Sequence, residues 1–379
     1  MKRPVYVSGR GAVTGFGDGL QRLIDGVYAG RTALRERRRT AAFAAPTRCV
    51  GEFPSDLFAA KDSNTDLPRQ AALRACAEAL QEASAGSAGE PDRATMGLVF
   101  ATTKADMSGV CGPGQGLASP MHLAAQLQRD LGLGVTPTAL SCACASGILG
   151  IATAARRIAL GELDRVLVVA ADVINAFILK GFGGMGALDP QRCRPFDADR
   201  RGVSLGDGAG AVLLSCHARE SVGVRVAGYA GANDACHVTG PDYEGRGVGL
   251  AASRAIAHAG LQPDDIDVLH LHATGTRAND KSEAIGLGNV WRQAGTTPPA
   301  FGTKSQTGHT LGAAGVLESL LAIAAIERQS APKNVGLTQT DCDPRLRLTQ
   351  NVTPLPGARH ALKVASGFGG VQGAAVFSA

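Results

Sequence analysis

The chain has 379 residues and a net charge of +5, and 45% of its residues are hydrophobic, 19% charged and 4% aromatic. This length and composition are typical of a globular protein with a large core, built from two domains or two packed halves. The few aromatic residues argue against binding of single-stranded nucleic acid, and the apolar run at residues 320–326 is too short to cross a bilayer. Nine cysteines without a secretory signal indicate free thiols in a reducing compartment, so we expect a cytoplasmic location.

Residues 5–11 predict a strand that ends in glycines. Gly9, Gly11 and Gly15 approximate a dinucleotide-binding fingerprint, but the third glycine is one position late and no acidic residue follows on a clear second strand. A tight exit from the strand explains these glycines better than nucleotide binding. The basic run RERRR at residues 35–39 is interpreted as solvated surface, and a docking patch for an acidic partner protein is the alternative.

Apolar periodicity then predicts helices over residues 68–83 and 121–131 and from Ile148 to a stop at Gly161, with strands over 96–102, 134–140, 166–171 and 206–214. A second half begins near Val222. It contains predicted strands over 224–229, 268–272, 362–365 and 374–377 and helices over 249–259 and 313–328. Because strands alternate with helices, we expect an α/β protein with buried sheets. The similar order of elements suggests an internal duplication, divided into residues 1–220 and 221–379.

Cys144 lies where the buried strand predicted over residues 134–140 turns into a helix. The first N–H groups of a helix have no partner within it and favour negative charge nearby. A thiol at this place is expected to have a lowered pKa and to act as a nucleophile. Small neighbours leave room for a substrate. The alternative is a buried thiol without a chemical role, as for most free cysteines.

Two stretches in the second half also carry reactive side chains. His272 stands at a predicted strand end, where α/β proteins place their sites, although a hydrogen-bonded core histidine is the alternative. Lys304 and His309 lie in a polar loop that opens the last helix. The pairs Cys142/Cys144 and His270/His272 could hold a metal, but their spacing is closer than in zinc sites, so no metal is expected.

Five motifs, in order, carry a family resemblance. They are ACASG at residues 143–147, RPFDADR at 194–200 with GDGAG at 206–210, HATGT at 272–276, TKSQTGH at 303–309 and GFGG at 367–370. Together they resemble the β-ketoacyl-acyl carrier protein synthases that elongate chains, over about residues 5–378. The resemblance implies a thiolase fold: two βαβαβαββ-like halves in a five-layered α-β-α-β-α arrangement, as a homodimer or as a heterodimer with a ketosynthase-like partner.

The resemblance also implies a catalytic set. Cys144 would take an acyl chain from acyl carrier protein as a thioester. His272 and His309 would surround the malonyl thioester and stabilise the enolate left when carbon dioxide departs. Lys304, with Glu318, would hold the histidines electrostatically. The phosphopantetheine arm belongs to the carrier protein, so no metal, nucleotide or flavin cofactor is implied.

Further residues match positions around that set. Phe368 would gate the cysteine, and its N–H with that of Cys144 would form the oxyanion hole. Thr274 and Thr276 would bind the phosphopantetheine arm. Asp280 and Glu283 match acidic family positions beside the substrate-binding residues, and supporting roles are expected for them. The chain departs from the family pattern in having Val371-Gln372 where Thr-Asn is usual, and in a shortened segment between residues 101 and 123, so the shape of the acyl pocket is open.

The implied activity is decarboxylative condensation of the Cys144-bound acyl group with malonyl-acyl carrier protein, giving 3-oxoacyl-acyl carrier protein in fatty-acid, polyene or polyketide assembly. The alternative is a non-catalytic chain-length partner, but such partners lack the nucleophile that this chain retains. A thiolase or initiating synthase would show a Cys-His-Cys or Cys-His-Asn set. A cysteine hydrolase would lack the lysine loop.

Overall fold

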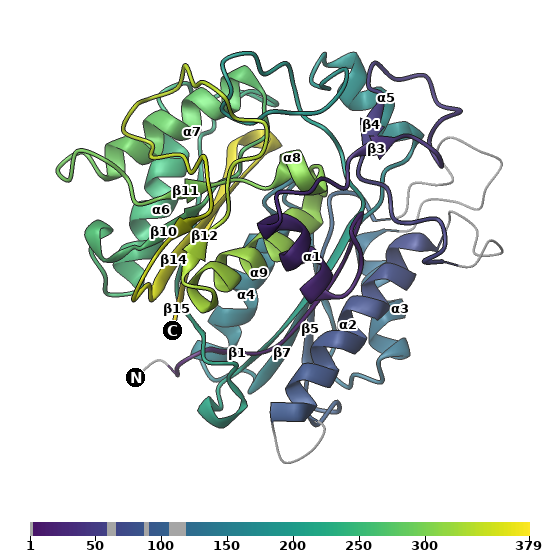
Figure 1. Ribbon diagram of the computed structural model, residues 1–379. Coiled ribbons are helices and arrows are strands. Elements are labelled where there is room, and N and C mark those ends of the chain that lie inside the picture. The colour runs from purple at the N-terminus through teal and green to yellow at the C-terminus, as the bar shows by residue number, and fades with distance from the viewer. Residues whose placement is uncertain (1–2, 59–65, 87–90, 106–118) are drawn as a thin grey trace.

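The computed structural model describes residues 3–58, 66–86, 91–105 and 119–379 (Figure 1). The main strands form one continuous sheet whose two halves are joined at a single pair of residues, Tyr6 of β1 and Arg225 of β9, and the two halves have the same strand order. The N-terminal half has the order β6-β5-β7-β8-β1, and the C-terminal half has the order β11-β10-β14-β15-β9. Their bounds are Tyr6–Thr14 (β1), Gly97–Ala101 (β5), Thr138–Leu140 (β6), Arg165–Asp172 (β7), Gly208–Ser215 (β8), Arg225–Asn233 (β9), Val268–His270 (β10), Ala300–Phe301 (β11), His360–Gly367 (β14) and Val371–Ser378 (β15).

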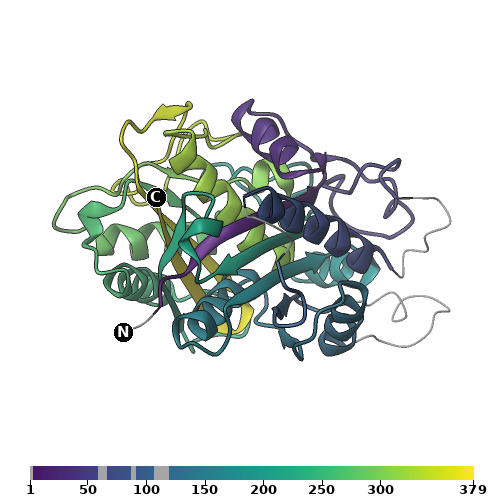
Figure 2. The ribbon, with the colours of Figure 1, turned by 90° about the horizontal axis from the view of Figure 1, so that it is seen from below.

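The helices complete a βαβαβαββ order in each half. Four of them cover the outer faces of the two sheets: α2 (Leu67–Gly86), α3 (Pro120–Asp130), α6 (Arg246–His258) and α7 (Arg277–Val290). Two central helices, α4 (Ser146–Ala159) and α9 (Ala314–Glu327), contact each other and strands of both halves (Figures 1 and 2). This is the predicted five-layered α-β-α-β-α arrangement.

The shorter elements lie outside this repeat. They are the helices α1 (Leu20–Tyr28), α5 (Ala176–Gly184) and α8 (Lys304–Thr307), and the two-residue strands β2 (Gly17–Asp18), β3 (Arg35–Glu36), β4 (Cys49–Val50), β12 (Ser330–Ala331) and β13 (Thr353–Pro354). The strand order repeats on either side of residue 220, but the division at that residue stays a prediction. Among the described helices, none is long and apolar enough to cross a membrane.

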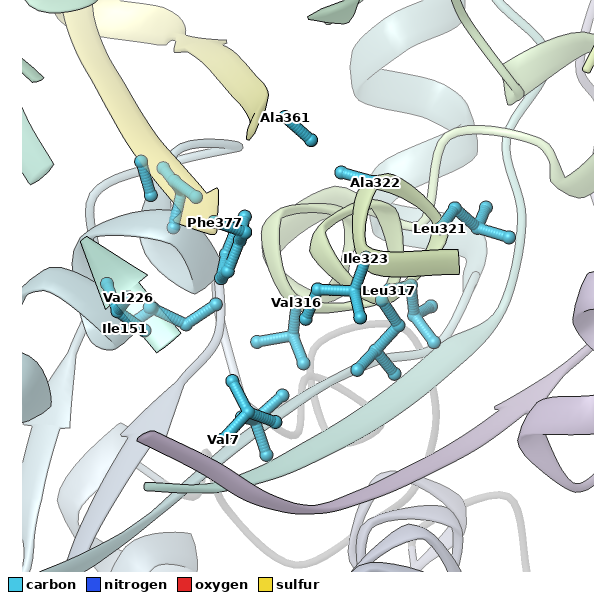
Figure 3. Packing of buried hydrophobic residues seen from close by; sticks show 14 of the residues in the cluster. Val7, Ile151, Val226, Val316, Leu317, Leu321, Ala322, Ile323, Ala361 and Phe377 are labelled. Atoms are coloured by element: carbon cyan, nitrogen blue, oxygen red, sulfur yellow. The ribbon is translucent and has the colours of Figure 1, made fainter. Parts of the chain in front are cut away.

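The central core cluster lies between the two halves of the sheet, around α4 and α9. Every residue of α9 from Ala314 to Ile326 is buried, as expected for a helix that is apolar on all sides. Ile151 of α4 packs in the same cluster as Val316 and Ile323 of α9, and Val7 of β1 and Phe377 of β15 close it from the two sheets (Figure 3). The central helices are therefore fixed from both sides.

The N-terminal ends of α4 and α9 cross at two glycines. A Cβ on Gly315 would lie 2.2 Å from the nitrogen of Ile148, and a Cβ on Gly147 would lie 2.7 Å from the oxygen of Gly312. Only hydrogen fits at these positions, because the neighbouring atoms are backbone and cannot move aside. Both helices therefore begin at the same place in the molecule.

Two predictions about strands are wrong in detail. β1 continues through Gly9 and Gly11 to Thr14, and a Cβ on either glycine would lie 2.0 Å from a carbonyl oxygen of α2. These glycines allow a helix to approach a strand; they do not end it. β6 is shorter than predicted and half-buried, because β5 is its only partner among the described strands. Most of the segment at residues 101–123, expected to shape the acyl pocket, lies outside the described residues.

We expect Gly315→Ala to lower the free energy of unfolding by about 2–3 kcal/mol, because overpacked backbone atoms must separate. Chemical denaturation monitored by circular dichroism measures this change. Gly181→Ala is the matched control, since Gly181 is also helical and a Cβ there meets no atom within 4 Å. Equal stability of the two variants would contradict the close crossing.

Candidate active site

Cys144 lies on the turn that joins β6 to α4. The turn needs a positive φ of 48° at Ala143, and the Ser146 hydroxyl stabilises it by accepting from Cys142 N–H (2.8 Å) and donating to the Ala143 carbonyl (2.5 Å). Cys144 is 6% exposed and lines a cavity of about 470 Å³. The thiol is therefore buried and yet reachable from that cavity.

The C-terminal half supplies two imidazoles to the same cavity. His272 follows β10 and His309 follows α8, and both line the cavity together with Cys144. The two rings lie 5.3 Å apart between centroids and are nearly perpendicular, at 86°. His272 and His309 follow Cys144 by 128 and 165 residues in the sequence, and the fold brings all three to one cavity, as the resemblance predicted.

Lys304 lies behind the histidines and is fully buried. Its ammonium group forms an ion pair of 2.5 Å with Glu318, donates to the His272 carbonyl and lies 3.4 Å from His272 Nδ1. An ammonium group can only donate, so His272 Nδ1 must accept and the ring proton stays on Nε2. His272 can then donate Nε2–H to a group in the cavity.

Both histidines are neutral at pH 7. Burial, and next the charge of Lys304, hold the pKa of His272 well below its usual value and lower the pKa of His309 to about 3. His309 Nδ1 is buried and has no hydrogen-bond partner among the described residues. The site therefore offers uncharged imidazoles, which can donate a hydrogen bond or accept a proton.

The prediction of an acidic thiol is wrong for the unliganded protein. Burial raises the pKa of Cys144 to about 12, although the charge of Lys304 acts in the opposite direction. Loss of solvation of the thiolate outweighs the favourable position before a helix. Cys144 is consequently a thiol at neutral pH, and a base must take its proton when it reacts.

The predicted substrate-binding residues fall into two groups. Thr274 and Thr276 line the cavity, with their hydroxyl oxygens 2.9 Å apart. Glu283 and Asp280 are buried and do not line it. Glu283 accepts from the N–H groups of His272 (2.5 Å) and Ala273 (2.9 Å), and Asp280 accepts from Phe196 N–H (2.7 Å) and Gly275 N–H (3.2 Å). The two carboxylates thus hold the backbone of the loop after β10, and a direct contact of either one with substrate stays a prediction.

Phe368 lies in the cavity wall beside Cys144 and is 37% exposed. Its ring stacks on Phe182 with centroids 5.6 Å apart. The preceding Gly367 packs against the cysteine turn, since a Cβ there would lie 3.2 Å from Ala145 N. This placement suits a movable gate, and the oxyanion hole formed by the N–H groups of Cys144 and Phe368 stays a prediction.

The basic run at residues 35–39 is only partly the solvated surface that was predicted. Within the basic run, Arg39 forms an ion pair of 2.6 Å with the buried Asp207, whereas Arg35 and Arg38 are exposed.

In the described residues, one group could hold a metal, namely Asp164, Cys216 and His217, and it includes none of the predicted site residues. His270 is a core histidine that hydrogen-bonds the Leu271 carbonyl and packs edge-on against Phe301.

One buried charge at the site lies outside all five sequence motifs. Lys363 lies in β14, fully buried, with its ammonium group 2.7 Å from the second oxygen of Glu318. The sequence contains a signal for this charge, because a lysine interrupts the apolar strand predicted at residues 362–365. A lysine in a strand predicted to be buried needs a carboxylate partner.

Comparison with known proteins places this geometry in a family. Models of the N-terminal and C-terminal domains of β-ketoacyl synthases match residues 2–219 and 224–338. Nodulation protein E of Rhizobium meliloti is 34% identical over 266 residues, which cover 69% of this chain and 66% of that protein. The 3-oxoacyl-[acyl-carrier-protein] synthase 2 of Mycobacterium bovis is 36% identical over 266 residues, covering 66% of this chain and 62% of that protein.

The solved structure of the ishigamide ketosynthase/chain length factor has the same fold. It matches with a TM-score of 0.89 and 26% sequence identity, over 100% of this chain and 99% of that chain. The two curated relatives are matched over slightly less than two thirds of their own length, 66% and 62%. Because both domain models match in order and the fold is shared, the chain belongs to the β-ketoacyl synthase family and has its thiolase-type fold.

Proposed function

We propose that this protein condenses a Cys144-bound acyl group with malonyl-acyl carrier protein, releasing carbon dioxide and giving 3-oxoacyl-acyl carrier protein. One observation carries the proposal: Cys144, His272 and His309 line a single cavity. The nucleophile comes from one half of the chain and the two imidazoles from the other. No metal or soluble cofactor takes part in the proposed reaction, and the phosphopantetheine arm arrives on the carrier protein.

The first half-reaction loads the enzyme. The Cys144 sulfur attacks the carbonyl carbon of the acyl thioester, its proton passes to a neutral imidazole of the site, and the carrier thiol leaves with a proton. The high pKa of the buried Cys144 thiol makes this proton transfer part of the attack. A new thioester on Cys144 replaces the one that is broken.

The second half-reaction forms the carbon–carbon bond. The malonyl group loses carbon dioxide, and the electron pair of the broken bond becomes the enolate of the remaining acetyl thioester. The Nε2–H of His272 can donate to the enolate oxygen, because Lys304 occupies the Nδ1 side. The enolate carbon attacks the acyl-Cys144 carbonyl, the carbon–sulfur bond of the thioester breaks, and the departing Cys144 thiolate takes up a proton from solvent.

The proposal includes the partners. The name of the mycobacterial relative states that it acts with acyl carrier protein, and the ishigamide structure is named as a ketosynthase with a chain length factor. We propose that this chain also acts on carrier-bound substrates. It does so as a homodimer or together with a ketosynthase-like partner, in a reducing cytoplasm. A purely non-catalytic role is disfavoured, since Cys144, His272, Lys304 and His309 are all present and meet.

We expect Cys144→Ala to abolish both acylation and condensation, since the sulfur atom carries the acyl group. Incubation with an acyl-carrier protein, followed by peptide mass spectrometry, locates the adduct. Cys142→Ala serves as the matched control and should still be acylated, because Cys142 lies two residues away and does not line the cavity. Condensation by Cys144→Ala would disprove the assignment of the nucleophile.

The alkylation of unliganded Cys144 by iodoacetamide should accelerate about tenfold per pH unit between pH 6 and 9, without a plateau. The thiolate reacts, and its fraction rises with pH while the pH stays below the pKa of Cys144, which is about 12. Quantitative peptide mass spectrometry gives the rate at Cys144 separately from other cysteines. A plateau near pH 7 would show instead that the helix position dominates over burial.

We propose that the exposed members of the basic run, Arg35 and Arg38, contribute to carrier-protein docking. The double change Arg35→Glu/Arg38→Glu should then weaken carrier binding severalfold and reduce its salt dependence, because opposite charges attract the acidic partner. The double change Arg254→Glu/Arg292→Glu, at two exposed arginines outside the basic run, changes the net charge equally and is the control. Affinity that falls equally in both variants would exclude a specific patch.

A further inference from the structure

Lys363 is a fully buried cation that the proposed mechanism does not use. It lies in β14 between buried apolar neighbours, and its ammonium group donates to the carbonyl oxygens of Leu271 (3.1 Å) and Val364. The same ammonium group lies 2.7 Å from Glu318 Oε2.

The Glu318 carboxylate forms an ion pair at each of its two oxygens. Lys304 binds Oε1 at 2.5 Å and Lys363 binds Oε2 at 2.7 Å. The two lysines lower the pKa of Glu318 to about 2, against the effect of burial, so the carboxylate is charged. One negative charge thus faces two positive charges inside the protein.

Other titratable groups face this cluster from neighbouring elements. His270, His272 and His309 are buried, with lowered pKa values, and are neutral. Burial raises the pKa of Glu283, on α7, to about 7. Below pH 7 the cluster therefore carries a surplus positive charge beside the cavity. Burying an unbalanced charge costs free energy, and a neutral cluster would need only one of the lysines.

The two lysines also hold consecutive carbonyl groups. Lys363 binds the carbonyl of Leu271, and Lys304 binds that of His272. Both contacts fix the backbone from which the His272 ring enters the cavity. Replacing Lys363 would release one of these contacts and leave Glu318 held by Lys304 alone.

We propose that Lys363 is a positioning residue of the active site: it fixes Glu318 opposite Lys304, and it gives the cluster the surplus positive charge that stabilises the enolate formed beside His272 and His309. This inference rests on the proposed condensation. The charge acts at the step where negative charge develops, so it should affect kcat more than KM. Lys363 acts through its neighbours and does not line the cavity.

The charge on Lys363 depends on pH in the working range. Burial lowers the pKa of Lys363 to about 8, although Glu318 acts to raise it. Lys363 is therefore charged below about pH 8 and loses its proton above it. The surplus charge, and with it the enolate stabilisation, is complete below pH 7. It declines first as Glu283 ionises near pH 7 and then as Lys363 loses its proton near pH 8.

The test measures malonyl-carrier decarboxylation by the full-length protein from pH 6 to 10. Lys363→Met should lower kcat at pH 7 on the order of tenfold or more, with KM within about twofold, and should remove the decline near pH 8. Lys363→Arg keeps the charge at all these pH values, so it should retain most of kcat and move the decline to higher pH. Lys281→Met, an exposed lysine paired with Asp341, is the matched control and should behave as the wild type.

Two outcomes would overturn the proposal. One is an unchanged kcat in Lys363→Met, and the other is a decline that stays near pH 8 in Lys363→Arg. A purely structural role would lower kcat equally at every pH, together with the melting temperature. If Lys363→Met does not fold, the pH profile of Lys363→Arg decides.

A second measurement separates this inference from the proposed function. NMR titration should show the pKa values of His272 and His309 rising in Lys363→Met, because the Lys363 charge is among the causes that lower them. If the wild type neither decarboxylates malonyl-carrier nor acylates Cys144, the proposed function fails, and unchanged histidine pKa values would refute the role of Lys363 independently. If the wild type is active and all Lys363 variants match it, only this inference fails.

Discussion

The backbone contact between α4 and α9 is the constraint on which the site depends. Gly147 and Gly315 let the two helices approach until backbone meets backbone, and this crossing lies at the first turns of both helices. The helix that follows Cys144 and the helix that follows His309 therefore start together. Asp172 adds a further link at the same end, since it accepts from the N–H groups of Thr103 and Gly312 at 2.8 Å each. A duplicated fold thus brings one reactive segment from each half to a common point.

Burial then decides the chemistry of the assembled groups. The same loss of solvation that raises the pKa of Cys144 lowers the pKa of His272 and His309. Before substrate binds, the site therefore contains a neutral thiol and neutral imidazoles, and burying these groups costs less free energy than burying an ion pair. In the proposed reaction negative charge develops on the substrate, and the ammonium groups of Lys304 and Lys363 are in place before it does. Positive charge fixed in advance needs no rearrangement during the reaction.

The carboxylates around the site illustrate how similar residues take different roles. Glu318 lies between two lysines and is ionised. Glu283 faces backbone N–H groups and has a pKa raised to about 7. Asp280 holds the backbone of Phe196 and Gly275, so it connects the loop after β10 to the arginine-containing segment at residues 194–200. None of the three lines the cavity. Asp280 and Glu283 hydrogen-bond the His272 loop directly, whereas Glu318 reaches it through Lys304 and Lys363, which donate to the carbonyl groups of His272 and Leu271.

The sequence alone determined the order of elements, the α/β class and the residues that meet at the cavity, because periodicity and motifs are local properties that survive without knowledge of packing. Cys144, His272, Lys304 and His309 were found in this way. The tertiary structure decided what depends on distant neighbours. The thiol of Cys144 is not acidic, since burial outweighs the helix end, and Asp280 and Glu283 hold the backbone of the loop after β10 without lining the cavity. Gly9 and Gly11 lie within a strand because α2 packs on them, and Lys363 joins the site through Glu318, 45 residues earlier in the chain. Solvation and charge are set by everything packed around a group, and no local pattern contains that information.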